Sequence, residues 1–286
     1  MRGGEYFAAG NGTDIYYSSE GAGGIPMLLI HGWTCDQNDW AFQIPFLLSL
    51  GIWVIAMDLR GHGHSAVSDA VTQFDPVSMV DDAVALLKHL GVDGRSSGGA
   101  GQAIVAGHSL GGIVANELAL RHPDLVRGVV SVDGGAYMTP DDIQHVSQLL
   151  RAAGPQGAAL ATTDFWDAVG LLSEDAPVWV RPWQQRRTWA VESRVVMDTF
   201  LQLGDHLGPS GVEYLRRTRG RGEGRVIPRF VTCAVDSSVE MEREAGLDAR
   251  VDRVEVVPGG HFHHVVSPDK FNALLKEWLT EREWIK

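Results

Sequence analysis

Ser109 lies in the segment GHSLG, where an apolar run that favours a strand passes directly into an apolar run that favours a helix. The glycines on either side of this turn let backbone segments approach closely, and they hold the serine in a strained conformation with its hydroxyl exposed. The amino-terminal end of the helix favours negative charge that develops beside it. The pattern predicts a nucleophilic serine that attacks a carbonyl carbon.

A serine hydroxyl is a poor nucleophile at neutral pH, so the site also needs a general base. The segment GGHFHHV, just past the last predicted strand, offers three histidines at residues 261, 263 and 264. A loop at this position can fold an imidazole over Ser109. The two segments together suggest nucleophilic catalysis by a serine and a histidine.

The composition argues against several other classes of function. The 286 residues carry 24 lysines and arginines against 36 aspartates and glutamates, and the formal charge of −12 argues against binding to nucleic acid or acidic lipid. Cys35 and Cys233 are too few for a disulfide framework or a zinc cluster. His31, His62 and His64 lack an accompanying carboxylate cluster, so we predict no metal site.

The sequence contains no stretch of about 18 apolar residues, and its first residues lack the apolar run of a signal peptide. We therefore expect a soluble, cytoplasmic protein with no membrane partner. A chain of 286 residues suffices for one large α/β domain, or for a core domain that carries an insertion.

The elements that must position Ser109 and the histidines alternate along the chain. Short apolar or β-branched runs that end in glycine, aspartate or histidine suit strands buried on both faces of a mostly parallel sheet. These runs cover residues 26–32, 52–58, 103–109, 125–133, 228–236 and 251–260. Helix-like segments separate them, and residues 5–17 suit an antiparallel hairpin at the sheet edge. Helix ends are predicted at the N-cap Asp75, before Pro123 and at Pro268.

Residues 137–224 break this alternation, because they favour helices and contain no convincing strand. We predict a helical cap here, inserted after the sixth strand of the sheet into a core formed by residues 1–136 and 225–286. The cap is rich in large aromatic side chains, which suit contact with a bulky apolar substrate. The substrate-binding candidates are Trp166, Trp179 and Trp183.

Four segments occur in an order that resembles the α/β-hydrolase family. They are LLIHGW, DLRGHGHS, GHSLGG and PGGHF, and the resemblance extends over essentially the whole chain. It implies an α/β fold with a mostly parallel, eight-stranded sheet, helices on both faces and an inserted helical cap. The DLRGHGHS segment resembles a structural turn near the site.

The resemblance also implies roles for individual residues. His261, the first histidine after the glycine pair, takes the position of the base, while His264 is expected to pack or cap and His263 to face solvent. In the family, two backbone N–H groups bind the oxyanion, and here they belong to Trp33 and Leu110.

Two aspartates compete for the position of the acid that orients His261. Asp236 ends the strand from which most of the family supplies its acid, and the order Ser109, Asp236, His261 fits. However, Ala234 replaces the usual glycine, and the aspartate comes one residue early. Asp133 follows the preceding strand, from which some relatives supply the acid. We expect Asp236 to be the acid, with Asp133 as the alternative.

The resemblance implies a serine hydrolase that cleaves a small-molecule carboxylic ester or lactone with a bulky apolar part, through an acyl-enzyme on Ser109. This chemistry requires no cofactor and no metal. One alternative is a cofactor-free dioxygenase of the same superfamily, which uses a histidine and an aspartate at the position of Asp133. Another is a ligand receptor on a hydrolase scaffold that turns over slowly. The oligomeric state is not predicted.

Overall fold

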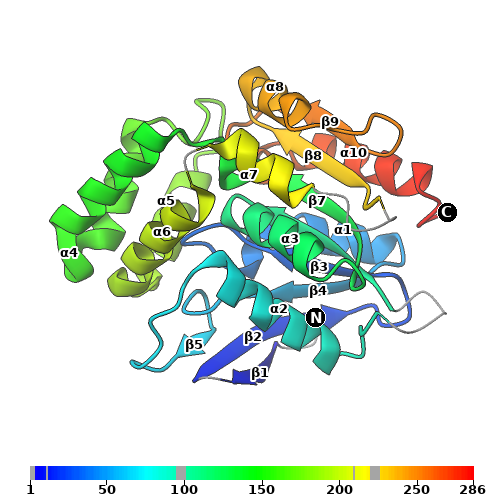
Figure 1. Ribbon diagram of the computed structural model, residues 1–286, viewed down its shortest axis with the longest axis horizontal. Helices are drawn as coiled ribbons and strands as arrows, with labels where there is room; N and C mark the ends of the chain where they lie inside the picture. Colours follow the sequence, from blue (N-terminus) through cyan, green and yellow to red (C-terminus); the bar gives the residue numbers. More distant parts are fainter. Residues whose placement is uncertain (1–3, 11, 95–100, 209, 220–225) are drawn as a thin grey trace.

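One sheet with helices on both sides forms the centre of the protein (Figure 1). The computed structural model describes residues 4–10, 12–94, 101–208, 210–219 and 226–286. Hydrogen bonds order the strands β1-β2-β4-β3-β6-β7-β8-β9, and a short β5 pairs with β2 beside this path. The strands are β1 (Glu5–Gly10), β2 (Thr13–Glu20), β3 (Pro26–Ile30), β4 (Trp53–Met57), β5 (Ala66–Val67), β6 (Ala103–His108), β7 (Val126–Val132), β8 (Arg229–Cys233) and β9 (Arg253–Val256).

Most of the sheet is parallel. Parallel pairing joins β4 to β3, β3 to β6, β6 to β7, β7 to β8 and β8 to β9. Antiparallel pairing joins β2 to β1, β4 and β5. The expected mostly parallel path of eight strands is confirmed, as is the hairpin at its edge. The two-residue β5 is an addition that the sequence did not indicate.

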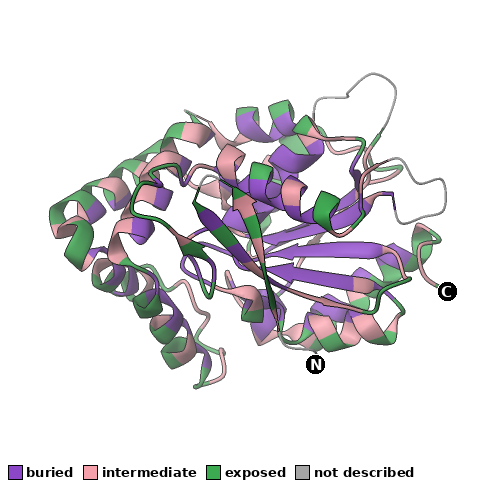
Figure 2. Ribbon diagram, turned by 90° about the horizontal axis from the view of Figure 1, so that it is seen from below, coloured by how far each residue is buried: buried purple, intermediate pink, exposed green. Residues whose placement is uncertain are grey.

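Alternate residues of the central strands enter two cores, one on each face of the sheet. On β3, Leu28 and Ile30 pack beneath α2 and α3, whereas Met27 and Leu29 pack against α1 and α10. Since helices cover both faces, the central strands are buried along their length (Figure 2). The helices around the sheet are η1 (Gln37–Trp40), α1 (Gln43–Ser49), α2 (Pro76–His89), α3 (Leu110–Arg121), η2 (Gly135–Tyr137), α8 (Asp236–Glu244), α9 (His263–Val266) and α10 (Pro268–Glu281).

The predicted helix ends follow their local signals. The Asp75 carboxylate accepts hydrogen bonds from the backbone N–H groups of Val77 and Ser78 and so caps α2. The helix α3 ends two residues before Pro123, and α10 has Pro268 at its first position. These three predictions are confirmed.

A helical insertion follows β7. Its helices are α4 (Pro140–Ala168), α5 (Val180–Ala190), α6 (Ser193–Leu207) and α7 (Gly211–Thr218). The helices α4, α5 and α6 lie together at one end of the sheet and form a cap, whereas α7 lies on the core helix α3 (Figure 1). The Tyr214 hydroxyl on α7 donates a hydrogen bond to the Ile113 carbonyl on α3. The cap is therefore shorter than the predicted range 137–224, whose last residues, 220–224, lie outside the described part of the chain.

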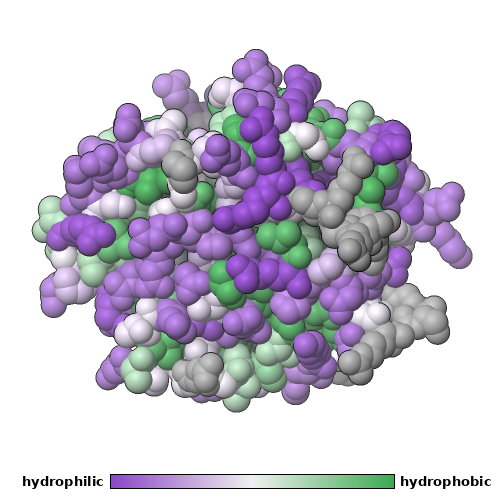
Figure 3. Space-filling model, viewed as in Figure 1, coloured by the Kyte–Doolittle hydropathy of each residue, from purple (hydrophilic) through white to green (hydrophobic). Residues whose placement is uncertain are grey.

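Hydrophilic residues dominate the surface on the side seen in Figure 1, and hydrophobic residues there form small separate patches (Figure 3). None of the described helices combines the length and the apolar composition that crossing a membrane requires.

Candidate active site

Ser109 occupies a strained turn between β6 and α3. Its φ of 52° and ψ of −117° lie in a region that residues with side chains rarely adopt. A Cβ on Gly107 would collide with the carbonyl of Gly111, and a Cβ on Gly111 would collide with the carbonyl of Ile30. The two glycines are needed because the backbone of α3 lies in direct contact with the backbones of β6 and β3. The GHSLG segment predicts such a close approach.

The backbone of Ser109 is tied to the neighbouring strand. Its N–H donates to the Val132 carbonyl at 2.9 Å, and its own carbonyl accepts from the N–H groups of Gly112 and Gly135. The nucleophile turn and the end of β7 are therefore held together directly. Asp133 is the next residue after β7, so these hydrogen bonds also fix its position relative to Ser109.

His261 lies in the turn between β9 and α9, and its ring contacts Asp133. Its Nδ1 lies 2.6 Å from Asp133 Oδ2. Because a carboxylate accepts, Nδ1 donates, and Nε2 is left with a lone pair. Nε2 makes no hydrogen bond with any described residue, and His261 lines the same cavity as Ser109. This is the tautomer that a general base requires.

Asp133 is held from both sides. Its second oxygen, Oδ1, accepts a hydrogen bond from the Ala234 N–H at 2.9 Å, and its backbone N–H donates to the Thr232 carbonyl. Burial raises the pKa of the Asp133 carboxyl, but the hydrogen bond and charge of His261 outweigh it, so that the pKa lies below its usual value. Asp133 is therefore ionised at neutral pH.

The structure corrects the expected position of the acid. Asp236 is exposed at the first position of α8 and makes no contact with His261. An acidic side chain is favoured at a helix amino terminus, which accounts for its place there. The segment after β8 contributes a backbone N–H from Ala234 to Asp133, and its own aspartate, Asp236, does not reach His261. Two departures in the sequence signalled this difference: Ala234 replaces the usual glycine, and Asp236 comes one residue early.

The other two histidines of the GGHFHHV segment are buried. His263 Nε2 lies 2.8 Å from Thr232 Oγ1, and its Nδ1 bonds the Gly260 carbonyl. The expectation that His263 faces solvent is wrong, because α9 turns this face of the segment toward β8. His264 is also fully buried and packs against Trp40, in line with a packing role.

Two backbone N–H groups near Ser109 are available to an oxyanion. Leu110 is the first residue of α3, and its N–H has no partner within the described chain; the same holds for the N–H of Trp33. The turn that carries Trp33 is close to the nucleophile, since a Cβ on Gly32 would lie 3.3 Å from the Ser109 Cβ. Both N–H groups therefore remain free to donate, and their role as oxyanion donors stays a prediction.

A cavity of about 390 Å³ extends from Ser109 and His261 into the cap. Its walls are mostly apolar, and Asp142 and His145 of α4 are polar exceptions. The apolar side chains come mainly from the cap helices, which close the site on the side away from the sheet. They include Met138, Phe165, Trp166, Leu171, Phe200 and Leu203.

The three candidate tryptophans are placed differently. Trp166 lines the cavity, but Trp179 and Trp183 do not. Trp179 is 42% exposed and packs on Phe42 and Trp183. Trp183 lies beneath the guanidinium of Arg187, which is 3.8 Å from its ring centre. These two tryptophans therefore have structural contacts, and Phe200 on α6 is a cavity residue that sequence reasoning missed.

The cap is joined to the segment that carries the base. The His261 N–H donates to the Leu171 carbonyl at 3.3 Å, and Leu172 forms an antiparallel bridge with Gly260. Residues of both the core and the cap therefore hold His261 in place.

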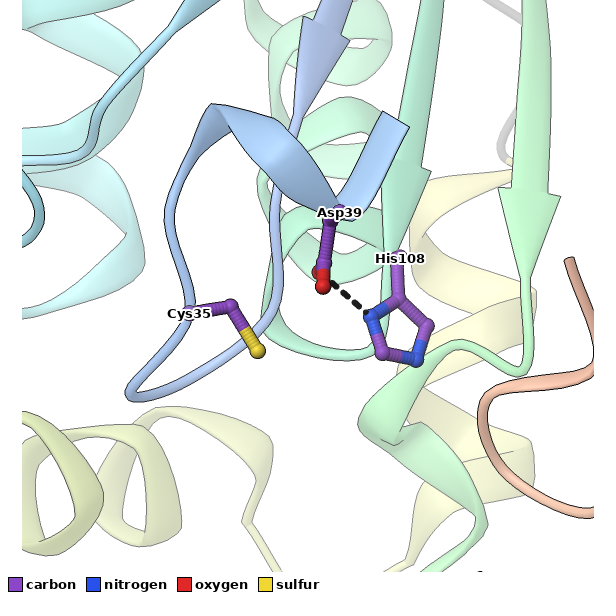
Figure 4. A group of neighbouring side chains, drawn as sticks. All are labelled: Cys35, Asp39 and His108. Atoms are coloured by element: carbon purple, nitrogen blue, oxygen red, sulfur yellow. Dashed lines mark hydrogen bonds and ion pairs between the residues drawn. The ribbon is translucent and has the colours of Figure 1, made fainter. Parts of the chain in front are cut away.

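Cys35, Asp39 and His108 form a buried group beside the cavity (Figure 4). Their potential ligand atoms lie within 4.8 Å of one another. The Asp39 oxygens, however, already bond His108 Nδ1 at 2.9 Å and Arg187 at 2.7 Å. Because a metal ion would have to displace this guanidinium, we interpret the group as part of an ion-pair network.

Comparison with known proteins gives a family match and several relatives. The model of the Alpha/beta hydrolase family matches residues 27–274. A non-heme haloperoxidase of Rhodococcus erythropolis is 36% identical over 117 residues, which are 41% of this chain and 39% of that protein. A bifunctional esterase/perhydrolase of Acinetobacter calcoaceticus is 33% identical over 120 residues, 42% of this chain and 40% of that protein.

The chain thus spans about two fifths of the length of these curated relatives. Among solved structures, a thermophilic esterase from Thermogutta terrifontis aligns with a TM-score of 0.75 and 24% identity over 99% of both chains. A likeness at this identity concerns the fold.

Proposed function

The chain belongs to the alpha/beta hydrolase family, and from this premise we propose that it is a serine hydrolase of carboxylic esters or lactones. The observation that carries the proposal is the assembly of Ser109, His261 and Asp133 around one cavity. Ser109 is the nucleophile, His261 is the base, and Asp133 orients the imidazole.

The first half of the reaction forms an acyl-enzyme. Ser109 Oγ attacks the carbonyl carbon while His261 Nε2 takes its proton. The oxygen of the carbonyl becomes negatively charged and is bound by the N–H groups of Trp33 and Leu110. His261 then gives the proton to the leaving alkoxide, and Asp133 stabilises the imidazolium in between.

The second half releases the acid. His261 takes a proton from a water molecule, which attacks the acyl carbon, and the oxyanion forms again at the same N–H groups. Its collapse returns the proton to Ser109 Oγ. Each step uses groups of this chain together with substrate and water.

The cavity favours a small-molecule substrate with a bulky apolar part. Its volume of about 390 Å³ and the aromatic side chains of Phe165, Trp166 and Phe200 suit an aromatic or branched acyl or alcohol group. The similarity to a bifunctional esterase/perhydrolase and to an esterase supports ester hydrolysis as the reaction.

An activity-based probe tests the proposal. A fluorophosphonate should label the wild-type protein on Ser109, as mapped by peptide mass spectrometry, and Ser109→Ala should abolish both labelling and turnover of chromogenic esters. Turnover that persists in Ser109→Ala would contradict the proposal. A single burst of product without sustained turnover would favour a ligand receptor.

The partnership of His261 with Asp133 also favours a second candidate, the cofactor-free dioxygenase. Such an enzyme uses the histidine and aspartate but needs no nucleophile at the turn. Oxygen consumption that survives Ser109→Ala, with no ester turnover in the wild type, would select this candidate.

A further inference from the structure

Asp39 is a fully buried carboxylate on η1 that touches two catalytic segments at once. Its Oδ2 bonds His108 Nδ1 at 2.9 Å (Figure 4). The same oxygen accepts a hydrogen bond from the Gly32 N–H at 3.1 Å. Gly32 immediately precedes Trp33, an oxyanion donor, and His108 immediately precedes Ser109. One carboxylate oxygen therefore fixes the spacing between the oxyanion turn and the nucleophile turn.

His108 carries this connection to the base. Its Nε2 lies 3.0 Å from the His261 carbonyl oxygen, and the two rings lie 4.7 Å apart. A carbonyl oxygen only accepts, so Nε2 donates. This bond holds the backbone of His261, while the His261 imidazole contacts Asp133 and lines the cavity.

Each ring nitrogen of His108 faces an oxygen: Nδ1 lies against Asp39 Oδ2 and Nε2 against the His261 carbonyl. Burial lowers the pKa of His108 below its usual value, and the Asp39 carboxylate opposes only part of this shift. Because Asp39 is the partner of Nδ1, it fixes the orientation of the ring that donates from Nε2 to the His261 carbonyl. The hold on His261 depends on Asp39 in this way.

Arg187 connects the network to the cap. It lies on α5, is almost fully buried, and donates to Asp39 Oδ1 at 2.7 Å. It also reaches Asp36 at 3.4 Å. Burial would raise the pKa of Asp39, but Arg187 and His108 outweigh it and hold the pKa well below its usual range. A buried charge requires such a partner, and here the cap provides it.

We propose that Asp39 is a positioning residue, which holds the oxyanion turn, the nucleophile turn and the base segment in register and depends on Arg187 of the docked cap. The proposal rests on the proposed serine hydrolase function. Asp39 touches neither substrate nor reacting atoms; it acts through Gly32 and His108.

The test compares Asp39→Asn with Asp36→Asn. An asparagine at position 39 cannot accept hydrogen bonds from Arg187, Gly32 and His108 together, whereas Asp36 contacts the same arginine but neither Gly32 nor His108. Small misplacements of catalytic groups cost about 10²-fold, so kcat for an ester should fall by about 10²-fold in Asp39→Asn. KM should stay within about twofold, because Asp39 itself does not line the cavity. Asp36→Asn should keep the wild-type kcat.

Equal losses in the two variants, or a change confined to KM, would overturn the proposal. His108→Asn supplies a second route if Asp39→Asn folds poorly, since it cuts the link to His261 and leaves Asp39 paired with Arg187. It should lower kcat in the same way. Loss of activity on chelation with EDTA, restored by zinc, would also overturn it, because Asp39 and His108 would then be metal ligands.

A readout without turnover separates this proposal from the proposed function. The proton between His261 Nδ1 and Asp133 should give a downfield ¹H NMR signal, given the 2.6 Å separation. The signal should shift or broaden in Asp39→Asn and His108→Asn and stay in place in Asp36→Asn. An unchanged signal in all three variants refutes the role of Asp39. If the signal shifts in Asp39→Asn and His108→Asn but the wild-type protein turns over no ester, the hydrolase function alone is refuted.

Discussion

Replacing Asp133 by asparagine should inactivate the enzyme while the fold survives, because the hydrogen bonds of this side chain decide which imidazole tautomer is present. Asp133 Oδ1 accepts from the Ala234 N–H at 2.9 Å. In Asp133→Asn the amide oxygen keeps this bond, so the amide NH₂ faces His261 Nδ1. The histidine must then accept at Nδ1 and carry its proton on Nε2, where it cannot accept the proton of Ser109.

The size of the loss follows from two contributions. Rotation of the amide to recover the working tautomer leaves the partly buried Ala234 N–H unpaired, which costs about 1–3 kcal/mol, or about 5- to 150-fold. The neutral amide also no longer stabilises the imidazolium, and two charges about 4 Å apart at an effective dielectric constant near 20 interact by about 4 kcal/mol. Together they predict a fall in kcat of at least about 10⁴-fold, as known for this change in a serine protease.

The assay is ester hydrolysis by Asp133→Asn and Asp236→Asn side by side, with thermal melts of both. Asp236 is exposed and makes no contact with His261, so Asp236→Asn should retain wild-type kcat. A folded Asp133→Asn protein within tenfold of wild-type activity would refute the tautomer reasoning. An inactive, folded Asp236→Asn would restore the acid that the sequence favoured.

Two further predictions concern the cavity and the cap. Trp166→Ala should lower kcat/KM about tenfold for bulky esters and little for acetates, because Trp166 lines the cavity. The control Trp179→Ala should leave kcat/KM unchanged for both kinds of ester, because Trp179 does not line the cavity. Equal effects of Trp166→Ala on all esters would assign Trp166 a structural role. Glu117 on α3 bonds His206 of the cap and Arg121, and these partners outweigh burial and lower its pKa from 4.5 to about 2. A depressed carboxyl pKa stabilises the fold above the unfolded value and loses that effect as pH falls from about 4.5 to about 2. Glu117→Gln should therefore cost about 1–2 kcal/mol in urea unfolding at pH 7, after allowance for screening around the half-exposed arginine, and the difference from wild type should shrink toward pH 2. A pH-independent difference would contradict this assignment.

Local sequence patterns were sufficient to predict the strands, the principal helix ends and the nucleophile turn. A buried parallel strand needs a continuous apolar run, and the strained turn at Ser109 needs small neighbours. Both features can therefore be recognised from a few consecutive residues. The cap helices were recognisable as helices, but their arrangement was not, because helical periodicity does not tell which neighbour a face meets. Trp179 and Trp183 resembled cavity residues for that reason, while Phe200 was overlooked.

The sequence ranked Asp236 above Asp133, because the choice between them depends on contacts between distant parts of the chain. Asp133 and Asp236 both follow strands whose carboxyl ends lie at the same edge of the sheet. What separates them is the Ala234 N–H, which reaches Asp133 from the next strand, and the early start of α8 at Asp236. The departure from the usual glycine spacing was visible in the sequence, but its meaning required the tertiary structure.

The hydrogen bond from His261 to the Leu171 carbonyl, and the bridge between Leu172 and Gly260, bear on how such proteins can be recombined. Cap exchange between homologues is a natural way to transfer substrate preference, and it treats the cap as a separable module. Here, however, residues of the cap hold the segment that carries His261. A chimera with a foreign cap would need a backbone carbonyl placed as that of Leu171 and a guanidinium placed as that of Arg187. Residues 171–187 are therefore the smallest part of the cap that should be kept with the core when the rest is exchanged.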